Sequence, residues 1–392
     1  MSDAAVVGGG LVGKAAALAL AQAGLRVRLC GAAAAAALPD AGFAQRIYAF
    51  NAASRALLQR LRVWDQLPAS RVQPVAAMRI GGDGAALDFD AAAQGAEALA
   101  WIAEADAVER ALDLALRFER GVDADPRRVS AARRADDGWR LEFDGGGEAC
   151  CALLLGADGR ASRVRQWAGI GQRSRPYGQT AVVANFRIDG DHGGAAYQAF
   201  GADGVIALLP LPQRQVSLVW SAPDALAAEL QRDAQLDAQS LAARVQRELP
   251  RLRAQRLGEL HAAGAVGSWP LLLQRAHSLA GTGAALLGDA GHVVHPLAGH
   301  GLNLGLQDVQ ALAAVLAARG PLAVDDARLL RRYARARAEQ VLALELATDG
   351  LQRLYALPWL APLRALGLAA TDQLPPLKRW LAAYASGSGV LS

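Results

Sequence analysis

The residues with the clearest chemical meaning lie in one stretch, Gly288–Asn303, which reads Gly-Asp-Ala-Gly-His-Val-Val-His-Pro-Leu-Ala-Gly-His-Gly-Leu-Asn. It follows the apolar segment Ala284–Leu287 and leads into a helix expected to begin near Leu302. The carboxylate of Asp289 can hydrogen-bond a polyol, and two loop glycines let backbone approach a flat ligand. The helix start offers free N–H groups and a positive dipole. The stretch therefore predicts a site for a flavin, whose ring becomes anionic when it is reduced.

A glycine triplet near the N-terminus predicts a second contact with the same ligand. Gly8, Gly10 and Gly13 follow the apolar strand Ala4–Val7 and open a helix over Leu11–Ala23, which is the context of a dinucleotide-binding turn. The first glycine permits the tight turn, the second lets backbone approach a pyrophosphate, and the third allows close helix–strand packing. The alternative is a glycine turn that binds nothing.

The acid that usually follows such a triplet and binds the adenosine ribose is missing. The second strand, Arg26–Cys30, ends at Cys30-Gly31, so we expect Cys30 to stand at the position of that acid. A charged hydrogen bond contributes roughly 1.5–3 kcal/mol, so its loss weakens cofactor binding without abolishing it. On this interpretation Cys30→Glu tightens binding. The alternative is that Cys30 is simply a small buried strand residue.

A third turn, Gly156–Arg160, follows the apolar strand Ala152–Leu155 and contains Asp158. It could be an ordinary Asp-Gly turn in which Ser162 caps a short helix. Its place after a strand, between the other two motifs, favours a role in cofactor binding.

Three histidines, His292, His295 and His300, lie in the loop of the first motif. Pro and Gly residues between them do not place them on one helical face, so the sequence predicts no metal site. We expect His295 or His300 to line the flavin or the substrate, with a histidine that only hydrogen-bonds backbone as the alternative.

Composition excludes several classes of protein. The chain has 392 residues, of which 53% are hydrophobic and 20% charged, as expected for a globular enzyme of about two domains. Its net charge of +4 comes from arginines interleaved with acids, so we expect no nucleic-acid partner. No uninterrupted apolar run reaches the ~18 residues of a membrane span. Three cysteines and no visible signal peptide indicate a reducing compartment, the cytoplasm.

The order of elements predicts an α/β fold with an insertion. Residues 1–75, 101–178 and 266–392 are expected to form the nucleotide-binding domain with C-terminal helices. Alternating residues such as those of Gln215–Trp220 predict that 76–100 and 179–265 form an inserted antiparallel sheet. We also expect helices over Gln45–Leu67 and Asp224–Leu249, and from Asp325 onward with a break at Gly350. The apolar end segment Leu351–Trp380 suits core packing, or a surface for lipid or a partner protein.

With these motifs in place, the chain resembles the class A FAD-dependent aromatic monooxygenases, and among them the ubiquinone-biosynthesis hydroxylases. The resemblance covers nearly the whole chain. Its matching stretches are Val6–Gly13, Arg46 with Asn51 and Ser54, Gly156–Arg165, Ala207–Trp220 and Gly288–Asn303. It implies a Rossmann-like, p-hydroxybenzoate hydroxylase-like FAD domain with an inserted substrate-binding sheet.

The resemblance also implies roles for individual residues. A Glu-Asn-Arg stretch of the family reads Glu104-Ala105-Asp106 here, which leaves Arg110 as the nearby basic candidate. The residues implied to act on the reaction are His295, Pro296 and Arg46. The residues implied to bind FAD are Gly8, Gly10, Gly13, Arg46, Arg110, Asp158, Asp289, Pro296, Gly299, Gly301, Leu302 and Asn303.

The implied reaction is hydroxylation of an aromatic ring with FAD, NAD(P)H and O2 through a flavin C4a-hydroperoxide. The expected substrate is a prenylated phenol of ubiquinone synthesis, and other quinone-biosynthesis proteins and peripheral contact with the inner membrane are expected partners. One alternative is a flavin-binding but weakly active or inactive scaffold of a biosynthetic complex. A flavin reductase or halogenase is another, but a halogenase needs a lysine near the flavin, and Lys14 and Lys378 lie elsewhere in the sequence.

Overall fold

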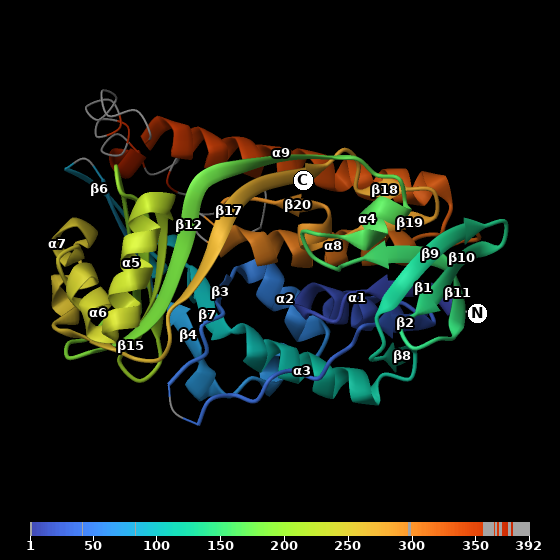
Figure 1. Cartoon of the computed structure of the whole chain (residues 1–392), viewed down its shortest axis with the longest axis horizontal. Coiled ribbons are helices and arrows are strands. Elements are labelled where there is room, and N and C mark those ends of the chain that lie inside the picture. Colours follow the sequence, from blue (N-terminus) through green and yellow to red (C-terminus); the bar gives the residue numbers. More distant parts are fainter. Residues whose placement is uncertain are drawn as a thin grey trace.

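The computed structural model describes residues 2–40, 42–82, 84–296 and 299–355, together with 364, 367, 371–374 and 378. Most of the apolar end segment 351–380 therefore lies outside the described residues. Two large sheets, one small sheet and a set of helices form the scaffold (Figure 1). This arrangement confirms the predicted α/β fold. The helices are α1 (Leu11–Gln22), α2 (Ala52–Arg60), α3 (Ala105–Phe118), α4 (Arg163–Trp167), α5 (Asp224–Leu236), α6 (Ala238–Gln246), α7 (Leu249–Leu252), α8 (His300–Ala317) and α9 (Ala327–Tyr355), with short 3-10 turns at Trp64–Gln66, Ala69–Arg71, Ala92–Gln94, Gln255–Leu257 and Gly288–Ala290.

The first sheet carries the predicted βαβ unit. Its central strands are parallel and almost wholly apolar, because helices or other chain segments cover both of their faces. Helix α1 leaves the end of its central strand and packs against α3 and α8. The strand order is β18 (Ala280–Gly281), β19 (Ala284–Leu286), β11 (Glu148–Gly156), β1 (Ser2–Val7), β2 (Val27–Cys30) and β8 (Val122–Asp125), with β10 (Gly138–Phe143) and β9 (Val129–Ala135) extending from β11.

The second sheet is almost entirely antiparallel, and among its described strands only β5 and β13 pair in parallel. Its residues alternate between two environments, as a pleated sheet requires. Residues such as Leu218 and Trp220 pack in a core beneath α5, α6 and α7, while Val219 and Ser221 face the opposite side. The strand order is β20 (His292–Val293), β17 (Gly267–Ala276), β12 (Gln172–Ile188), β15 (Gln215–Pro223), β14 (Gly204–Leu211), β13 (Ala195–Gly201), β5 (Ala77–Gly82) and β6 (Ala85–Asp90), and β16 (Leu260–Ala262) pairs with β12.

The small sheet corrects one sequence prediction. The segment Gln45–Leu67 is not one helix, because β3 (Ile47–Phe50) pairs with β7 (Ala100–Glu104), which also pairs with β4 (Val72–Val75). Helix α2 begins only after Asn51, whose side chain accepts a hydrogen bond from the Ser54 N–H at 2.9 Å. An N-cap of this kind fixes the first turn of a helix, so the strand ends where the cap stands.

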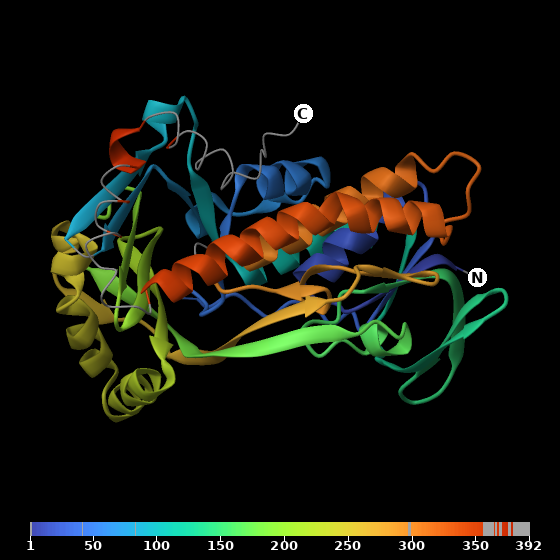
Figure 2. The same ribbon diagram turned by 90° about the horizontal axis from the view of Figure 1, so that it is seen from above.

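Two other helix predictions were wrong in detail. The expected helix over Asp224–Leu249 is divided into α5 and α6 at Asp237, whose side chain accepts from the N–H of Gln239. Helix α9, conversely, continues through the expected break at Gly350 to Tyr355. Figure 2 shows it running along much of the molecule. Ion pairs from Glu345 to Arg275 and from Asp349 to Arg175 join it to β17 and β12.

The division of the chain into two domains stays a prediction. Strands β12 and β17 arch between the two ends of the molecule (Figure 1), and the expected boundary between 178 and 179 falls inside β12. Within the part of the chain that the structure describes, no helix combines the length and apolar composition needed to cross a bilayer.

Candidate active site

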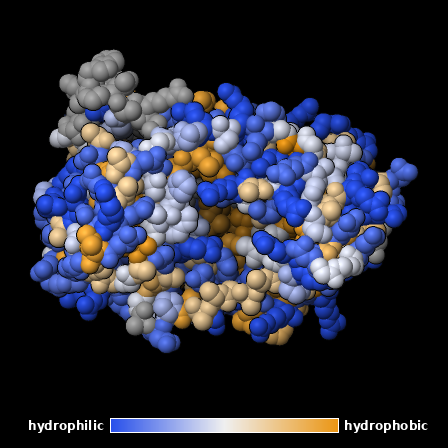
Figure 3. Space-filling model, in the orientation of Figure 1, coloured by the Kyte–Doolittle hydropathy of each residue, from blue (hydrophilic) through white to orange (hydrophobic). Residues whose placement is uncertain are grey.

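The three predicted turns converge on one cavity of about 720 Å³. Residues of the first and second turns, Gly10 and Gly159, line it together with residues of the third. The other wall is the exposed face of the second sheet. Figure 3 shows a hollow in the middle of one face of the molecule with hydrophobic residues inside it. The predicted site residues that line the cavity are Gly10, Arg46, Asp289, Pro296, Gly299, Gly301, Leu302 and Asn303.

The N-terminal glycines form a cradle that larger residues would fill. Gly8 has a φ of +121°, and a Cβ on it would lie 2.2 Å from the Ala157 carbonyl oxygen of the second turn. A Cβ on Gly13 would lie 1.8 Å from the Gly8 oxygen. Gly10, in contrast, caps α1 and faces open space. The backbone is therefore packed tightly behind the helix start and left open in front of it, which suits a pyrophosphate.

The Asp158 turn forms a helix cap, and its role in cofactor binding stays a prediction, because Gly159 lines the cavity and Asp158 does not. One carboxylate oxygen of Asp158 accepts from the N–H groups of Arg163 and Val164 at 2.7 and 3.1 Å, and the Ser162 hydroxyl accepts from the Arg165 N–H at 3.0 Å. The second oxygen of Asp158 is buried without a hydrogen-bond partner among the described residues.

Asp289 projects into the cavity from the third turn. Its carboxylate has no hydrogen-bond partner among the described residues, and its side chain is exposed to the open cavity. Partial desolvation by the cavity walls raises the pKa of Asp289, and His292 and Arg160 oppose the shift. An acceptor of this kind at a strand end can bind the hydroxyl groups of a polyol chain.

A buried ion network that the sequence analysis missed lies behind this turn. The carboxylate of Asp308 on α8 is fully buried and accepts from the Gly288 N–H at 2.9 Å, from Arg337 Nε at 2.6 Å and from His292 Nε2 at 2.7 Å. Burial would raise the pKa of Asp308, but His292 and Arg337 outweigh it and lower the pKa. Arg337 belongs to the arginine-rich stretch Arg331–Arg337 of α9, but it is only 2% exposed because it points at this carboxylate.

The N-terminus of α8 faces the cavity. The helix begins at His300, two residues before the predicted start, and Gly299 caps it with a φ of +68°. Asn303 ties this end to the small sheet, because its Oδ1 accepts from the Asn51 N–H at 3.0 Å and its Nδ2 donates to the Ala49 oxygen at 2.8 Å. The helix dipole therefore points its positive end at the cavity.

The two predicted arginines lie in different surroundings. Arg46 lines the cavity beside Tyr48 and forms an ion pair with Glu109 of α3 at 3.1 Å. Arg110 is exposed on α3 and is not among the cavity-lining residues. Its contact with the cofactor stays a prediction.

His295 does not lie where the sequence analysis expected it. The ring is fully buried but does not line the cavity. Its Nε2 hydrogen-bonds the Gln179 Oε1 at 2.9 Å, and the ring packs edge-on against Tyr177. Burial lowers the pKa of His295 to about 4, so the imidazole is neutral at physiological pH. His292 hydrogen-bonds Asp308 instead, so the two imidazole rings have different partners.

Cys30 does not occupy the position of a ribose-binding acid. Its side chain is fully buried in the core, and burial together with Asp125 on the neighbouring strand raises the pKa of the thiol to about 12. A Cβ on the next residue, Gly31, would instead meet no atom within 4 Å. Alternation along the strand turns Cys30 inward, so the alternative interpretation of a small buried strand residue is the one that fits.

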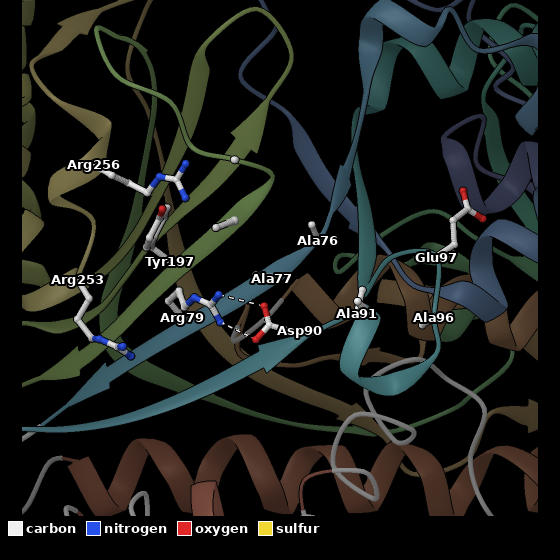
Figure 4. Close-up of a pocket in the computed structure, with 13 residues that line it drawn as sticks. Ala76, Ala77, Arg79, Asp90, Ala91, Ala96, Glu97, Tyr197, Arg253 and Arg256 are labelled. Atoms are coloured by element: carbon white, nitrogen blue, oxygen red, sulfur yellow. Dashed lines mark hydrogen bonds and ion pairs between the residues drawn. The ribbon is translucent and has the colours of Figure 1, made fainter.

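A second cavity of about 460 Å³ lies on the other side of the second sheet (Figure 4). Arginines line it, but acids already neutralise them: Arg79 pairs with Asp90 at 3.0 Å, and Arg253 pairs with Asp88. None of the predicted cofactor residues lines this cavity. It therefore lies apart from the candidate active site.

The fold and the three converging turns define a FAD-binding protein of the monooxygenase class. Residues 1–347 match the family described as FAD binding domain. The ubiquinone hydroxylase UbiL of Rhodospirillum rubrum is 35% identical over 99% of this chain and 90% of its own length. The 3-demethoxyubiquinol 3-hydroxylase of Escherichia coli is 36% identical over 98% of both chains. The chain belongs to the FAD-dependent hydroxylase family of ubiquinone biosynthesis.

Solved structures agree on the fold. The p-nitrophenol 4-monooxygenase PnpA of Pseudomonas putida superposes with a TM-score of 0.78 at 19% identity, covering 100% of this chain and 99% of that one. Klebsiella pneumoniae HpxO complexed with FAD and uric acid superposes with a TM-score of 0.73 at 21% identity, covering 99% of this chain and 98% of that one.

We expect Asp289→Ala to lose bound FAD, because the acceptor for the polyol chain is removed. One charged hydrogen bond contributes roughly 1.5–3 kcal/mol, which corresponds to a 10- to 150-fold weaker dissociation constant. The ratio of flavin to protein absorbance after gel filtration measures the loss. Asp136→Ala, at an exposed turn far from the cavity lining, is the control and should keep its flavin. Full retention by the Asp289 variant would refute the assignment.

We expect Asp308→Asn to lower the free energy of unfolding by about 3–5 kcal/mol, because it leaves Arg337 buried without a counter-charge. Urea unfolding followed by circular dichroism measures the change. Glu142→Gln removes an exposed partner of Arg133 at 3.9 Å and should shift stability by less than about 1 kcal/mol. Equal effects of the two substitutions would show that the buried network is dispensable.

We expect Cys30→Glu to destabilise the protein rather than to tighten cofactor binding. The new carboxylate would be buried beside Asp125, at a cost of about 3 kcal/mol or more. The thermal unfolding temperature of this variant is compared with that of Cys30→Ser. The serine side chain is nearly isosteric with cysteine. A stable Cys30→Glu protein with a lower FAD dissociation constant would restore the sequence-based interpretation.

Proposed function

We propose that the protein hydroxylates an aromatic ring that carries a long apolar substituent, with NAD(P)H and O2 as co-substrates. A polyprenyl phenol of ubiquinone synthesis is a substrate of this class. The observation that carries the proposal is the single cavity, which has the FAD-binding turns on one side and an apolar sheet face on the other. The names of the Rhodospirillum rubrum and Escherichia coli relatives, both hydroxylases of ubiquinone compounds, support it.

The residues on the cofactor side fit FAD. Asp289 supplies an acceptor for hydroxyl groups, and the open face of Gly10 admits phosphate. When bound, FAD supplies the redox chemistry, since it accepts a hydride from NAD(P)H and activates O2. The N-terminus of α8 stabilises negative charge that develops beside it. Arg46 adds a positive side chain at the cavity wall.

The sheet wall would bind the substrate and exclude water. Val183, Val219 and Leu271 belong to an apolar surface that continues to Met78 and Phe89 at the sheet edge. The cavity of about 720 Å³ has to receive part of FAD as well as the substrate, and its apolar sheet-side lining extends from Leu271 to Phe89. An apolar tail can lie along that lining and keep water away from the reacting centre.

The proposal needs no acid–base pair on the protein. Two histidines of the cofactor loop are buried: His292 hydrogen-bonds Asp308, and His295, which is neutral at physiological pH, is held by Gln179 outside the cavity. The contribution of the protein is therefore orientation, exclusion of water and electrostatic stabilisation. The sequence-based assignment of His295 to the reaction gains no support from its position.

We infer that the site of action is the cytoplasmic surface of the inner membrane, where a prenylated substrate resides. Leu342 and Leu346, one turn apart on α9, are 41% and 63% exposed and support contact with a lipid surface. Other quinone-biosynthesis proteins remain proposed partners.

The experiment is turnover of prenylated phenols by purified protein, with substrate identity taken from the compound that accumulates in a deletion strain. We expect yellow protein that consumes NAD(P)H and O2 and forms a hydroxylated product. Each buried methylene contributes about 0.8 kcal/mol, so removing one five-carbon unit from the tail should raise KM at least tenfold. Colourless protein that still rescues the deletion strain would instead support the scaffold alternative.

A further inference from the structure

The sheet wall of the cavity carries two polar side chains in an otherwise apolar surface. Gln198 on β13 and Ser221 on β15 line the cavity from the two strands that flank β14. Their neighbours on the same face are small or apolar, such as Ala207 and Val219. Polar groups in such a wall call for a physical reason.

The side chain of Gln198 lies on the cavity side of the sheet. Its sequence neighbours Tyr197 and Ala199 pack in the core on the opposite side, as the alternation of a strand requires. Figure 4 shows the side chain of Tyr197 among the residues of the second cavity. Gln198 is 5% exposed, so the cavity is the space into which its amide can point.

The amide of Gln198 has no hydrogen-bond partner among the described residues, neither for its two donors nor for its acceptor. The residues beside it in register, Ala207 on β14 and Ile80 on β5, have apolar side chains. The amide atoms are not fully buried but open on the cavity, where solvent can reach them in the empty protein. A molecule bound in the cavity displaces that solvent, and it must offer the amide a hydrogen bond in return or leave it unsatisfied.

We propose that Gln198 binds an oxygen substituent of the substrate ring and so fixes which ring carbon faces the FAD-binding turns. The inference rests on the proposed function and names the residue that orients the substrate. A neutral amide can donate to a hydroxyl, methoxy or keto oxygen and can accept from a hydroxyl group. Ser221, two strands away and offset by two residues along the sheet, is a separate polar group on the same wall. The apolar remainder of the wall cannot orient a ring in this way, since hydrophobic contact is not directional.

The test compares wild type with Gln198→Met, which keeps the length of the side chain and removes the amide. Binding is measured by isothermal titration calorimetry for a ring with its oxygen substituents and for an analogue that lacks one of them. We expect wild type to bind the oxygenated ring about five- to tenfold more tightly, and the variant to bind both equally. In turnover, we expect the variant to keep its FAD, consume O2 and release more hydrogen peroxide and less hydroxylated product.

Stability separates this role from a structural one. Because the Gln198 amide has no partner among the described residues, Gln198→Met should not lower the thermal unfolding temperature of the substrate-free protein. Gln246→Met is the matched control, since the Gln246 amide donates to the Gly258 oxygen and accepts from the Leu260 N–H. The control should lose stability and keep wild-type substrate discrimination and product yield.

Two results would overturn the proposal. One is a Gln198→Met variant that still discriminates between the two rings and hydroxylates the same carbon. The other is a variant that loses stability as the Gln246 control does while its product yield stays normal. If wild type forms no hydroxylated product with any ring tested, the proposed function fails instead. Ring discrimination in the binding experiment still tests Gln198 in that case, because binding requires no turnover.

Discussion

The carboxylate of Asp308 is the group on which the geometry of the site depends most. It is fully buried, and its hydrogen bonds reach Gly288, His292 and Arg337, so it joins the cofactor turn, the short strand β20 and the long helix α9. A buried charge tolerates few arrangements, because each lost hydrogen bond leaves an unsatisfied group in a medium of low dielectric constant. The turn that presents Asp289 is consequently fixed from behind, before any ligand is bound.

Each of the two large sheets contributes one wall of the cavity. The parallel sheet brings the ends of β1, β11 and β19 to one edge, and the glycine turn and the two glycine–aspartate turns follow those strands. The antiparallel sheet contributes one apolar face, which its own helices leave uncovered. Strands β12 and β17 are long enough to connect the two ends of the molecule, so the cofactor side and the substrate side belong to one continuous scaffold.

The turns could be predicted from the sequence because each is a local feature, set by a few glycines next to an apolar strand. The family and the fold followed from the same motifs. What could not be predicted depends on contacts between distant residues: the pairing of Ile47–Phe50 with β7, and the burial of Arg337 against Asp308, 29 residues away. The predicted positions of the Cys30 and His295 side chains were wrong for a third reason. A one-residue difference in alternation or loop direction reverses the side to which a side chain points.

The polar groups of this site are of two kinds. Some have their hydrogen-bond partners within the protein, and others face the cavity without one. Arg165 donates to the Ala290 and Arg160 oxygens, and His292 and Asn303 are likewise bound within the protein. Asp289 and Gln198, in contrast, face the cavity with no partner among the described residues. Groups that are satisfied within the protein hold the fold, whereas groups open to the cavity exchange solvent for a ligand when one binds. Because Asp289 stands on the cofactor wall and Gln198 on the sheet wall, each wall presents a polar group to the molecule that binds against it.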